Sequence, residues 1–193
     1  MTFQIIAIAV LIAFYGCYFA KLFSQKRKGI QTDQIGKGKI GFVKFVEVTM
    51  KISAVLVFIV GLVSIFIGTG HSSLPFRIAG AGVSVVGTVI FIISVLTMRD
   101  SWRAGVPEND RTELVTGGIY QISRNPAFLG FDLLYIGILM MFFNRLLCVV
   151  SVFAIIMYHL QIVNVEEKFL LITFGDEYLK YKKKVCRYIG RKR

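Results

Sequence analysis

The chain has 193 residues, of which 55% are hydrophobic and 18% charged, so it is far more apolar than a soluble globular domain. A globule of this size could not bury so much apolar surface, which predicts that lipid covers the chain. The net charge of +12 gathers at the ends of apolar runs without interleaved aromatic residues, and this argues against nucleic-acid binding. Three cysteines without CxxC spacing indicate neither a metal site nor a disulfide scaffold.

Charged residues divide the sequence into five apolar stretches of about the twenty residues that a helix needs to cross a bilayer. The expected spans are residues 3–20, 52–70, 78–98, 126–143 and 146–165. The first stretch meets Lys21 instead of a small-residue cleavage site, so we interpret it as a helix and not as a signal peptide. We therefore predict an all-α, polytopic integral membrane protein.

Residues 1–193 are expected to form a single membrane domain. Its first part, 1–99, holds three spans and a basic loop, and its second part, 100–193, holds a helical hairpin and a basic tail. Of the 23 Lys and Arg residues, all except Arg77 and Arg145 fall on one side of this arrangement. The positive-inside rule then predicts an outside N-terminus and a cytosolic C-terminus.

The third expected span contains four small residues, Gly80, Gly82, Ser84 and Gly87. They do not form a dinucleotide-binding fingerprint, because Val85 occupies the place of its third glycine and no strand precedes them. Small residues in a membrane helix are typical of a close-packing face. We expect a neighbouring helix to pack tightly here.

Two cytosolic stretches carry the candidate chemistry, namely residues 100–126 and the segment that starts at Glu166. The short connection between the last two spans brings Arg124 to the same depth as Glu166 and Glu167, so opposite charges can meet. Because water should reach this interface, we expect loss of Arg124 or Glu167 to cost only about 0–1 kcal/mol of stability. Taken alone, Arg124 fits a side chain that snorkels to lipid phosphates better than a functional group.

Two further residues are candidates for the substrate side of such a site. Asp132 lies within the fourth span, where an ionisable group is expensive and tends to face a cavity or a partner. His159 precedes Glu166 by two helical turns and should share its face. A packing role for His159 is the alternative.

Two motifs on the predicted hairpin carry a resemblance to a known family. The first, G-x-Y followed by R-x-P and a glycine, is made by Gly118, Tyr120, Arg124, Pro126 and Gly130. The second, E-E-x-x-L followed by F-G-x-x-Y-x-x-Y, is made by Glu166, Glu167, Leu170, Phe174, Gly175, Tyr178 and Tyr181. From about residue 101 to 189 the chain thus resembles the isoprenylcysteine carboxyl methyltransferases, relatives of the phospholipid methyltransferases, with Asn125 and Phe128 in place of the family's His and Tyr.

The resemblance implies S-adenosylmethionine as the cofactor and assigns roles to residues. Arg124 and Glu167 would be catalytic, with the planar guanidinium of Arg124 binding a carboxylate through two bonds. Asn125 cannot titrate, so no acid–base role falls to that position. The cofactor would be held by Val115, Gly118, Ile119, Tyr120, Asn125, Pro126, Glu166, Tyr178 and Tyr181.

The acceptor implied by the resemblance is a lipophilic or isoprenoid-type carboxylate, or another lipid-like molecule, that enters from the bilayer at the cytosolic face. The segment 101–120 resembles a bacterial branch of the family, which implies the bacterial cytoplasmic membrane and puts a prenylcysteine acceptor in question. Oligomeric state stays open. Two other classes fit the same pattern: an NADPH-dependent membrane enzyme like the sterol reductases, and a non-enzymatic membrane subunit.

Overall fold

The computed structural model describes residues 1–68, 72–106 and 113–192. These residues contain no strand, and the expected all-α membrane fold is confirmed. The shorter elements are η1 (Arg99–Ser101), η2 (Gly118–Gln121) and the π-helical η3 (Ile162–Glu166). The α-helices are α1 (Thr2–Arg27), α2 (Gly41–Ile67), α3 (Leu74–Met98), α4 (Pro126–Met141), α5 (Arg145–Gln161) and α6 (Glu167–Lys184).

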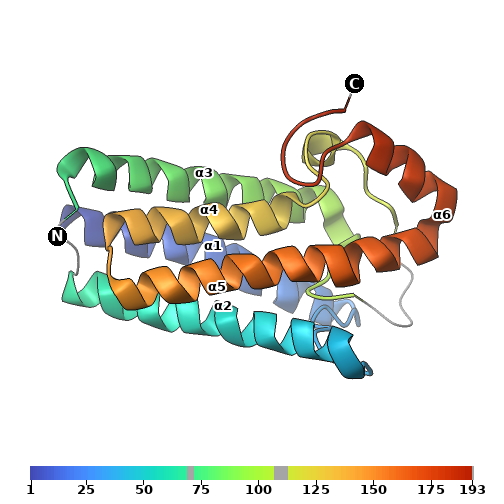
Figure 1. Cartoon of the computed structure of the whole chain (residues 1–193), viewed down its shortest axis with the longest axis horizontal. Helices are drawn as coiled ribbons and strands as arrows, with labels where there is room; N and C mark the ends of the chain where they lie inside the picture. The colour runs from blue at the N-terminus through green and yellow to red at the C-terminus, as the bar shows by residue number, and fades with distance from the viewer. Residues whose placement is uncertain (69–71, 107–112, 193) are drawn as a thin grey trace.

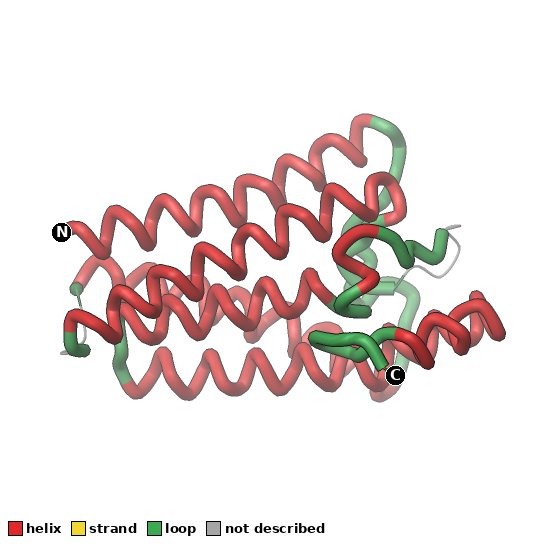
Figure 2. Tube along the Cα trace, turned by 90° about the horizontal axis from the view of Figure 1, so that it is seen from above, coloured by secondary structure: helices red, strands yellow, loops and turns green. Residues whose placement is uncertain are grey.

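Helices α1 to α5 run alongside one another as an elongated bundle, and α6 extends from one end of it (Figures 1 and 2). Among the described residues, four helical stretches are long and apolar enough to cross a membrane: 2–27, 41–67, 74–101 and 145–184. Helix α4 is shorter, with 16 residues, and runs along α3 toward the end at which α5 begins. The chain is thus a polytopic membrane protein.

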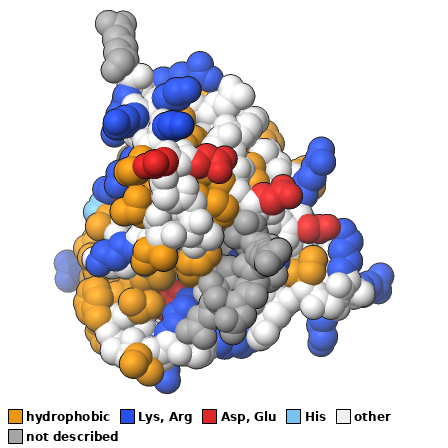
Figure 3. Space-filling view, turned by 90° about the vertical axis from the view of Figure 1, so that its right-hand side faces the viewer, with side chains coloured by type: hydrophobic (Ala, Val, Ile, Leu, Met, Phe, Trp, Pro, Cys, Tyr) orange, Lys and Arg blue, Asp and Glu red, His pale blue; other side chains and the backbone are white. Residues whose placement is uncertain are grey.

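One end of the bundle, which we call the basic end, carries residues 28–40, 99–106, 113–125 and 167–192. Figure 3 looks onto this end and shows Lys and Arg side chains around its rim. Arg77 and Arg145 begin helices at the opposite end. Residues 107–112, which include Arg111 of the candidate stretch 100–126, lie outside the described residues.

Several helices are longer than the apolar stretches that predicted them. Helix α1 continues past residue 20 to Arg27, and α2 begins at Gly41, well before the expected start at residue 52. Lys, Arg and Glu are good helix formers, so a charged residue ends the contact with lipid without ending the helix. Hydropathy marks the bilayer, and the backbone hydrogen bonds continue beyond it.

The small residues of α3 pack against α4, as expected. A Cβ added to Gly87 would lie 2.8 Å from the Gly130 carbonyl oxygen, and one added to Gly80 would lie 2.8 Å from that of Gly137. Gly82, on the other side of α3, has no such neighbour within 4 Å. Glycine on both helices therefore lets the two backbones touch, which fixes the height at which α4 presents Arg124 and Asn125.

This contact predicts a difference between two substitutions on one helix. Gly87→Ala forces α3 and α4 apart and is expected to cost about 1–3 kcal/mol of stability. Gly82→Ala meets open space and should leave stability equal or higher. Thermal unfolding of both purified variants in detergent measures the difference, and equal unfolding midpoints would show that the α3–α4 contact is not tight.

Candidate active site

The loop before α4 is shaped by η2 and by a tyrosine cluster at the basic end. Gly118 has φ +57°, and a side chain there would also press on Thr97. The Tyr181 hydroxyl donates to the Tyr120 carbonyl oxygen at 2.6 Å and so ties the loop to α6. Burial first, then the neighbouring Tyr181 and Glu166, raise the pKa of Tyr120, so its phenol stays neutral. Ile119 packs against this cluster.

Arg124 and Glu167 meet, as the hairpin predicted, with Arg124 Nη2 2.9 Å from Glu167 Oε1. Arg124 Nη1 also donates to the Tyr178 hydroxyl at 2.6 Å. The two charged residues are only 7% and 6% exposed, so the expectation that water reaches them is wrong. The reason is that α6 and the chain after it fold back over the start of α4 (Figure 1).

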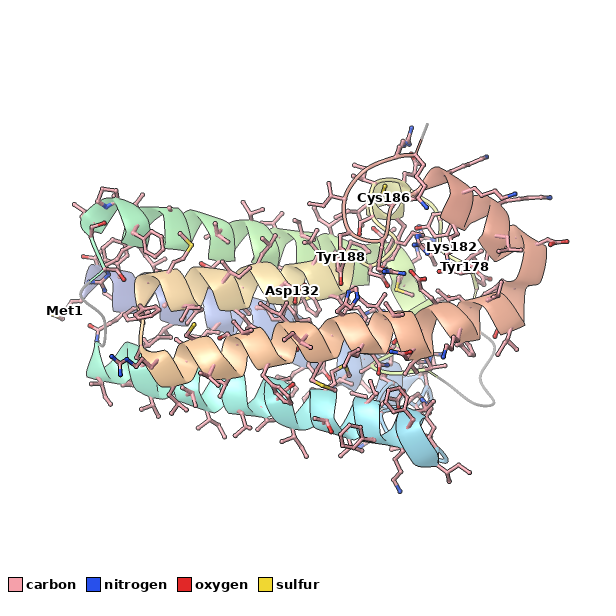
Figure 4. All side chains as sticks on the ribbon, in the orientation of Figure 1. Met1, Asp132, Tyr178, Lys182, Cys186 and Tyr188 are labelled. Carbon is pink, nitrogen blue, oxygen red and sulfur yellow. The ribbon has the colours of Figure 1, made fainter. Side chains whose placement is uncertain are left out.

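Glu167 accepts from three cations at once. Arg187 binds both carboxylate oxygens, with Nε 2.8 Å from Oε1 and Nη2 3.1 Å from Oε2. Lys182 lies 3.2 Å from Oε2, and Figure 4 shows it beside Tyr178. The hydrogen bond to Glu167 raises the pKa of Arg187 above its usual value, so this partner stays charged. Every face of the Glu167 carboxylate is therefore occupied by a donor.

One nitrogen of the Arg124 guanidinium has no partner among the described residues. Its Nη1 and Nη2 face Tyr178 and Glu167, whereas its buried Nε has no hydrogen-bond partner among the described residues. Glu167 and Tyr178 already take a hydrogen bond each from Nη2 and Nη1, and the expected two-bond grip on a ligand carboxylate stays a prediction. A buried N–H without a partner is costly. Arg124 Nε is therefore a candidate contact for a polar ligand.

A cavity of about 480 Å³ opens beside Arg124 and Asn125. Its polar part also includes Val115, Tyr120, Glu166 and Tyr181 from the predicted site residues. Its apolar part runs between α1 and α2 and is lined by Tyr15, Tyr18, Phe19, Ala54, Val55, Phe58, Phe128 and Phe131. One space thus joins the basic end to the interior of the bundle, and its size is typical of ligand sites.

Glu166 is a carboxylate of this cavity that lacks a cation. It forms no ion pair with a described residue, and Gln161 Nε2 approaches its Oε1 at 3.3 Å. The π-helical turn η3 separates it from Glu167, whose side chain faces Arg124. The neighbouring buried Glu47 is neutralised by Lys39. The cavity therefore offers one donor nitrogen without a partner and one carboxyl group without a cation.

The remaining predicted residues lie around the cavity without lining it. Pro126 opens α4. Its neighbour Asn125, which does line the cavity, donates from Nδ2 to the Arg187 carbonyl oxygen at 3.1 Å. Neither Asp132 nor His159 lines the cavity. Asp132 lies along α4 (Figure 4), with one buried carboxylate oxygen that has no partner among the described residues.

His159 is exposed, and its Nδ1 lies 2.7 Å from the Tyr188 hydroxyl. The expected common face with Glu166 is wrong, because η3 changes the helical phase between them.

Sequence reasoning missed Arg187 and Lys182, since each looked like one of many lysines and arginines in a basic tail. It also missed Glu47, Lys39 and Gln161, which come from separate parts of the chain. A search of the sequence for cations that could pair with the glutamates near the membrane is the one signal that could have found these residues. Three glutamates sit in or beside apolar helices and need partners.

Comparison with known proteins places this site in a family. Residues 76–177 match the phospholipid methyltransferase family. This match covers more than half of the chain and includes Arg124, Glu166 and Glu167.

The chain belongs to the phospholipid methyltransferase family.

Several curated relatives carry methyltransferase names. The protein-S-isoprenylcysteine O-methyltransferase of Saccharomyces cerevisiae is 39% identical over 72 residues, which are 37% of this chain and 30% of the yeast protein. A probable protein-S-isoprenylcysteine O-methyltransferase of Oryza sativa subsp. indica is 30% identical over 103 residues, or 52% and 54% of the two chains. Protein-S-isoprenylcysteine O-methyltransferase A of Arabidopsis thaliana is 29% identical over 104 residues, or 53% of each. The matches thus span about a third to about half of these relatives.

The buried ion pair predicts a stability effect that differs from the sequence-based expectation. Glu167→Ala leaves Arg124 buried without its charge partner and should cost about 3 kcal/mol, or about 9 °C in the unfolding midpoint. Glu177→Ala removes an exposed carboxylate from the same helix and should change little. Thermal unfolding in lipid nanodiscs compares the two, and matching midpoints would contradict the burial of the pair.

Proposed function

We propose that this member of the phospholipid methyltransferase family transfers a methyl group from S-adenosylmethionine to a lipophilic acceptor at the cytosolic face of the membrane. One observation carries the proposal. Arg124, whose buried Nε–H has no partner among the described residues, lines the same cavity as Glu166. This cavity is polar at the basic end and apolar inside the bundle. Family membership and the names of the relatives support the same reaction class.

The free groups of the cavity fit the cofactor. The methionine part of S-adenosylmethionine carries a carboxylate and an ammonium group, which match the Arg124 N–H and the Glu166 carboxylate. The loop around Val115 and Tyr120 supplies backbone and aromatic surface for the adenosine part. When bound, this cofactor supplies a methyl group on a positively charged sulfur, and transfer to an acceptor oxygen makes one C–O bond as one C–S bond breaks.

The chain's own residues then need to position the reactants and exclude water. A carboxylate acceptor is already ionised, so no strong base is required, and Glu167, with all its faces occupied, cannot act as one. Its role is to hold Arg124. The free N–H of Arg124 would orient a carboxylate, either that of the cofactor or that of the acceptor. The aromatic walls between α1 and α2 keep the site poor in water.

The apolar part of the cavity sets the acceptor class. Its walls come from α1, α2 and α4 and present mainly aromatic and aliphatic side chains, which fit a hydrocarbon chain reaching in from the bilayer. We therefore propose a lipid-like acceptor, with a carboxylate or another nucleophile at the end that reaches Arg124. The bacterial cytoplasmic membrane is the proposed location.

Labelled S-adenosylmethionine tests the reaction directly. Protein in nanodiscs of native lipid should pass the label to a lipid-extractable product that mass spectrometry identifies. Arg124→Ala should lower this turnover about a thousandfold, because a donor inside a desolvated site contributes several kcal/mol to the transition state. Lys183→Ala, a change at an exposed residue of α6, should leave it unchanged.

Calorimetry with S-adenosylmethionine separates the two carboxylates that Arg124 could hold. If Arg124 binds the cofactor, the affinity of Arg124→Ala for S-adenosylmethionine should fall. If Arg124 binds the acceptor, that affinity should be retained. Retention of more than a tenth of parental turnover would remove Arg124 from the reaction. Folded protein that binds NADPH and not S-adenosylmethionine would favour a reductase, and protein that binds neither would favour a non-enzymatic subunit.

The proposed cytosolic position of the site predicts the topology of the chain. Single cysteines introduced at Lys39 and Lys183, in a background that lacks Cys17, Cys148 and Cys186, should both be shielded from an impermeant thiol reagent added to intact cells. A cysteine introduced at Ser73, before α3, should react. Opposite accessibility of positions 39 and 183 would contradict the arrangement.

A further inference from the structure

The residues after α6 fold back onto the start of α4 and complete its surroundings. The backbone amide of Arg124 donates to the Cys186 carbonyl oxygen at 3.1 Å, and the backbone amide of Gly190 donates to the Ile122 carbonyl oxygen at 2.8 Å. Tyr188 is held to His159 at the side of α5. We call residues 185–192 the return segment. It places Arg187 against the Glu167 carboxylate.

The three cations around Glu167 do not share its oxygens equally. Oε1 holds Arg124 Nη2 at 2.9 Å and Arg187 Nε at 2.8 Å. Oε2 holds Arg187 Nη2 and Lys182 Nζ at 3.1 and 3.2 Å. Arg187 is therefore the only cation besides Arg124, among the described residues, on the oxygen that holds Arg124. Lys182 acts on the other oxygen alone.

This geometry limits how Glu167 can bind Arg124. A carboxylate and a guanidinium without competitors tend to pair through two parallel N–H···O bonds. For Arg124, the second bond would come from Nε, the one guanidinium nitrogen of this cavity-lining residue that has no partner among the described residues. Arg187 already makes the two-bond contact with Glu167, so only one bond is left for Arg124.

We propose that Arg187 is a positioning residue that keeps the Nε–H of Arg124 free for the ligand by occupying both oxygens of Glu167. The inference rests on the proposed function for its effect on turnover, but its structural part stands on the contacts alone. The return segment thus acts on the reaction through Arg124. Glu167 would otherwise capture the donor that the cavity needs.

Arg187→Ala is the test, with Lys182→Ala as the matched control on the same carboxylate. Glu167 keeps two cations in each variant, so the unfolding midpoint should stay within a few degrees of the parent. Turnover with labelled S-adenosylmethionine should fall at least tenfold in Arg187→Ala and clearly less in Lys182→Ala, and it should stay unchanged in Lys183→Ala, a change at an exposed residue of α6. Arg187→Lys, which restores a charge but only a single-point donor, should be intermediate.

A spectroscopic measurement makes the test independent of turnover. In protein labelled with 15N-arginine, the Nε–Hε resonance of Arg124 is assigned by its loss in Arg124→Lys. It should move downfield in Arg187→Ala, as Glu167 takes up the proton in a hydrogen bond, and stay in place in Lys182→Ala. An unmoved resonance in Arg187→Ala, or equal shifts in the two variants, would overturn the inference. A parent protein without methyl transfer would overturn the proposed function and leave this measurement valid.

Discussion

The basic end of the protein depends on the buried contact between Arg124 and Glu167. It joins the loop before α4 to the start of α6, two segments that lie far apart in the sequence. Burying such a pair is favourable only when further hydrogen bonds satisfy both ions. Tyr178, Lys182 and Arg187 supply them. The tyrosine cluster, the return segment and the polar wall of the cavity all follow from this requirement.

The membrane sets the second constraint. Lipid tails are as apolar as the helix surfaces, so helices associate through close packing and not through the hydrophobic effect. The glycines of α3 and α4 meet this need on one side of the bundle. The cavity runs between α1 and α2 on another side, where bulky aromatic residues line it. The bundle is thus tight where it carries Arg124 and open where a lipid-like ligand would enter.

Much of this arrangement could be predicted from the sequence because it follows from local patterns. Apolar length gave the spans, small residues gave the α3 packing face, and the short turn at Asn144 brought Arg124 level with Glu167. The environment of the pair could not be predicted. Glu167, which binds Arg124, is itself held by Arg187, and the place of Arg187 is set by a chain reversal that no local pattern marks.

The same limit applies to His159 and Asp132. Their expected place near the substrate assumed an unbroken α-helical phase and an inward-facing carboxylate. The structure instead places His159 against Tyr188 and keeps both residues out of the cavity lining. A single non-α turn was enough to defeat a periodicity argument that was sound for the rest of α5.

That turn, η3, has a consequence for how the chain can change over evolution. An α-helix advances about 100° per residue, so the wide turn at residues 162–166 acts as an inserted residue that sets the rotation of α6 against α5. Deleting one residue there would change no side chain of the site, yet it would swing Glu167 about a quarter turn away from Arg124. The spacing between the hairpin and the glutamate pair is therefore expected to tolerate substitutions much better than insertions or deletions.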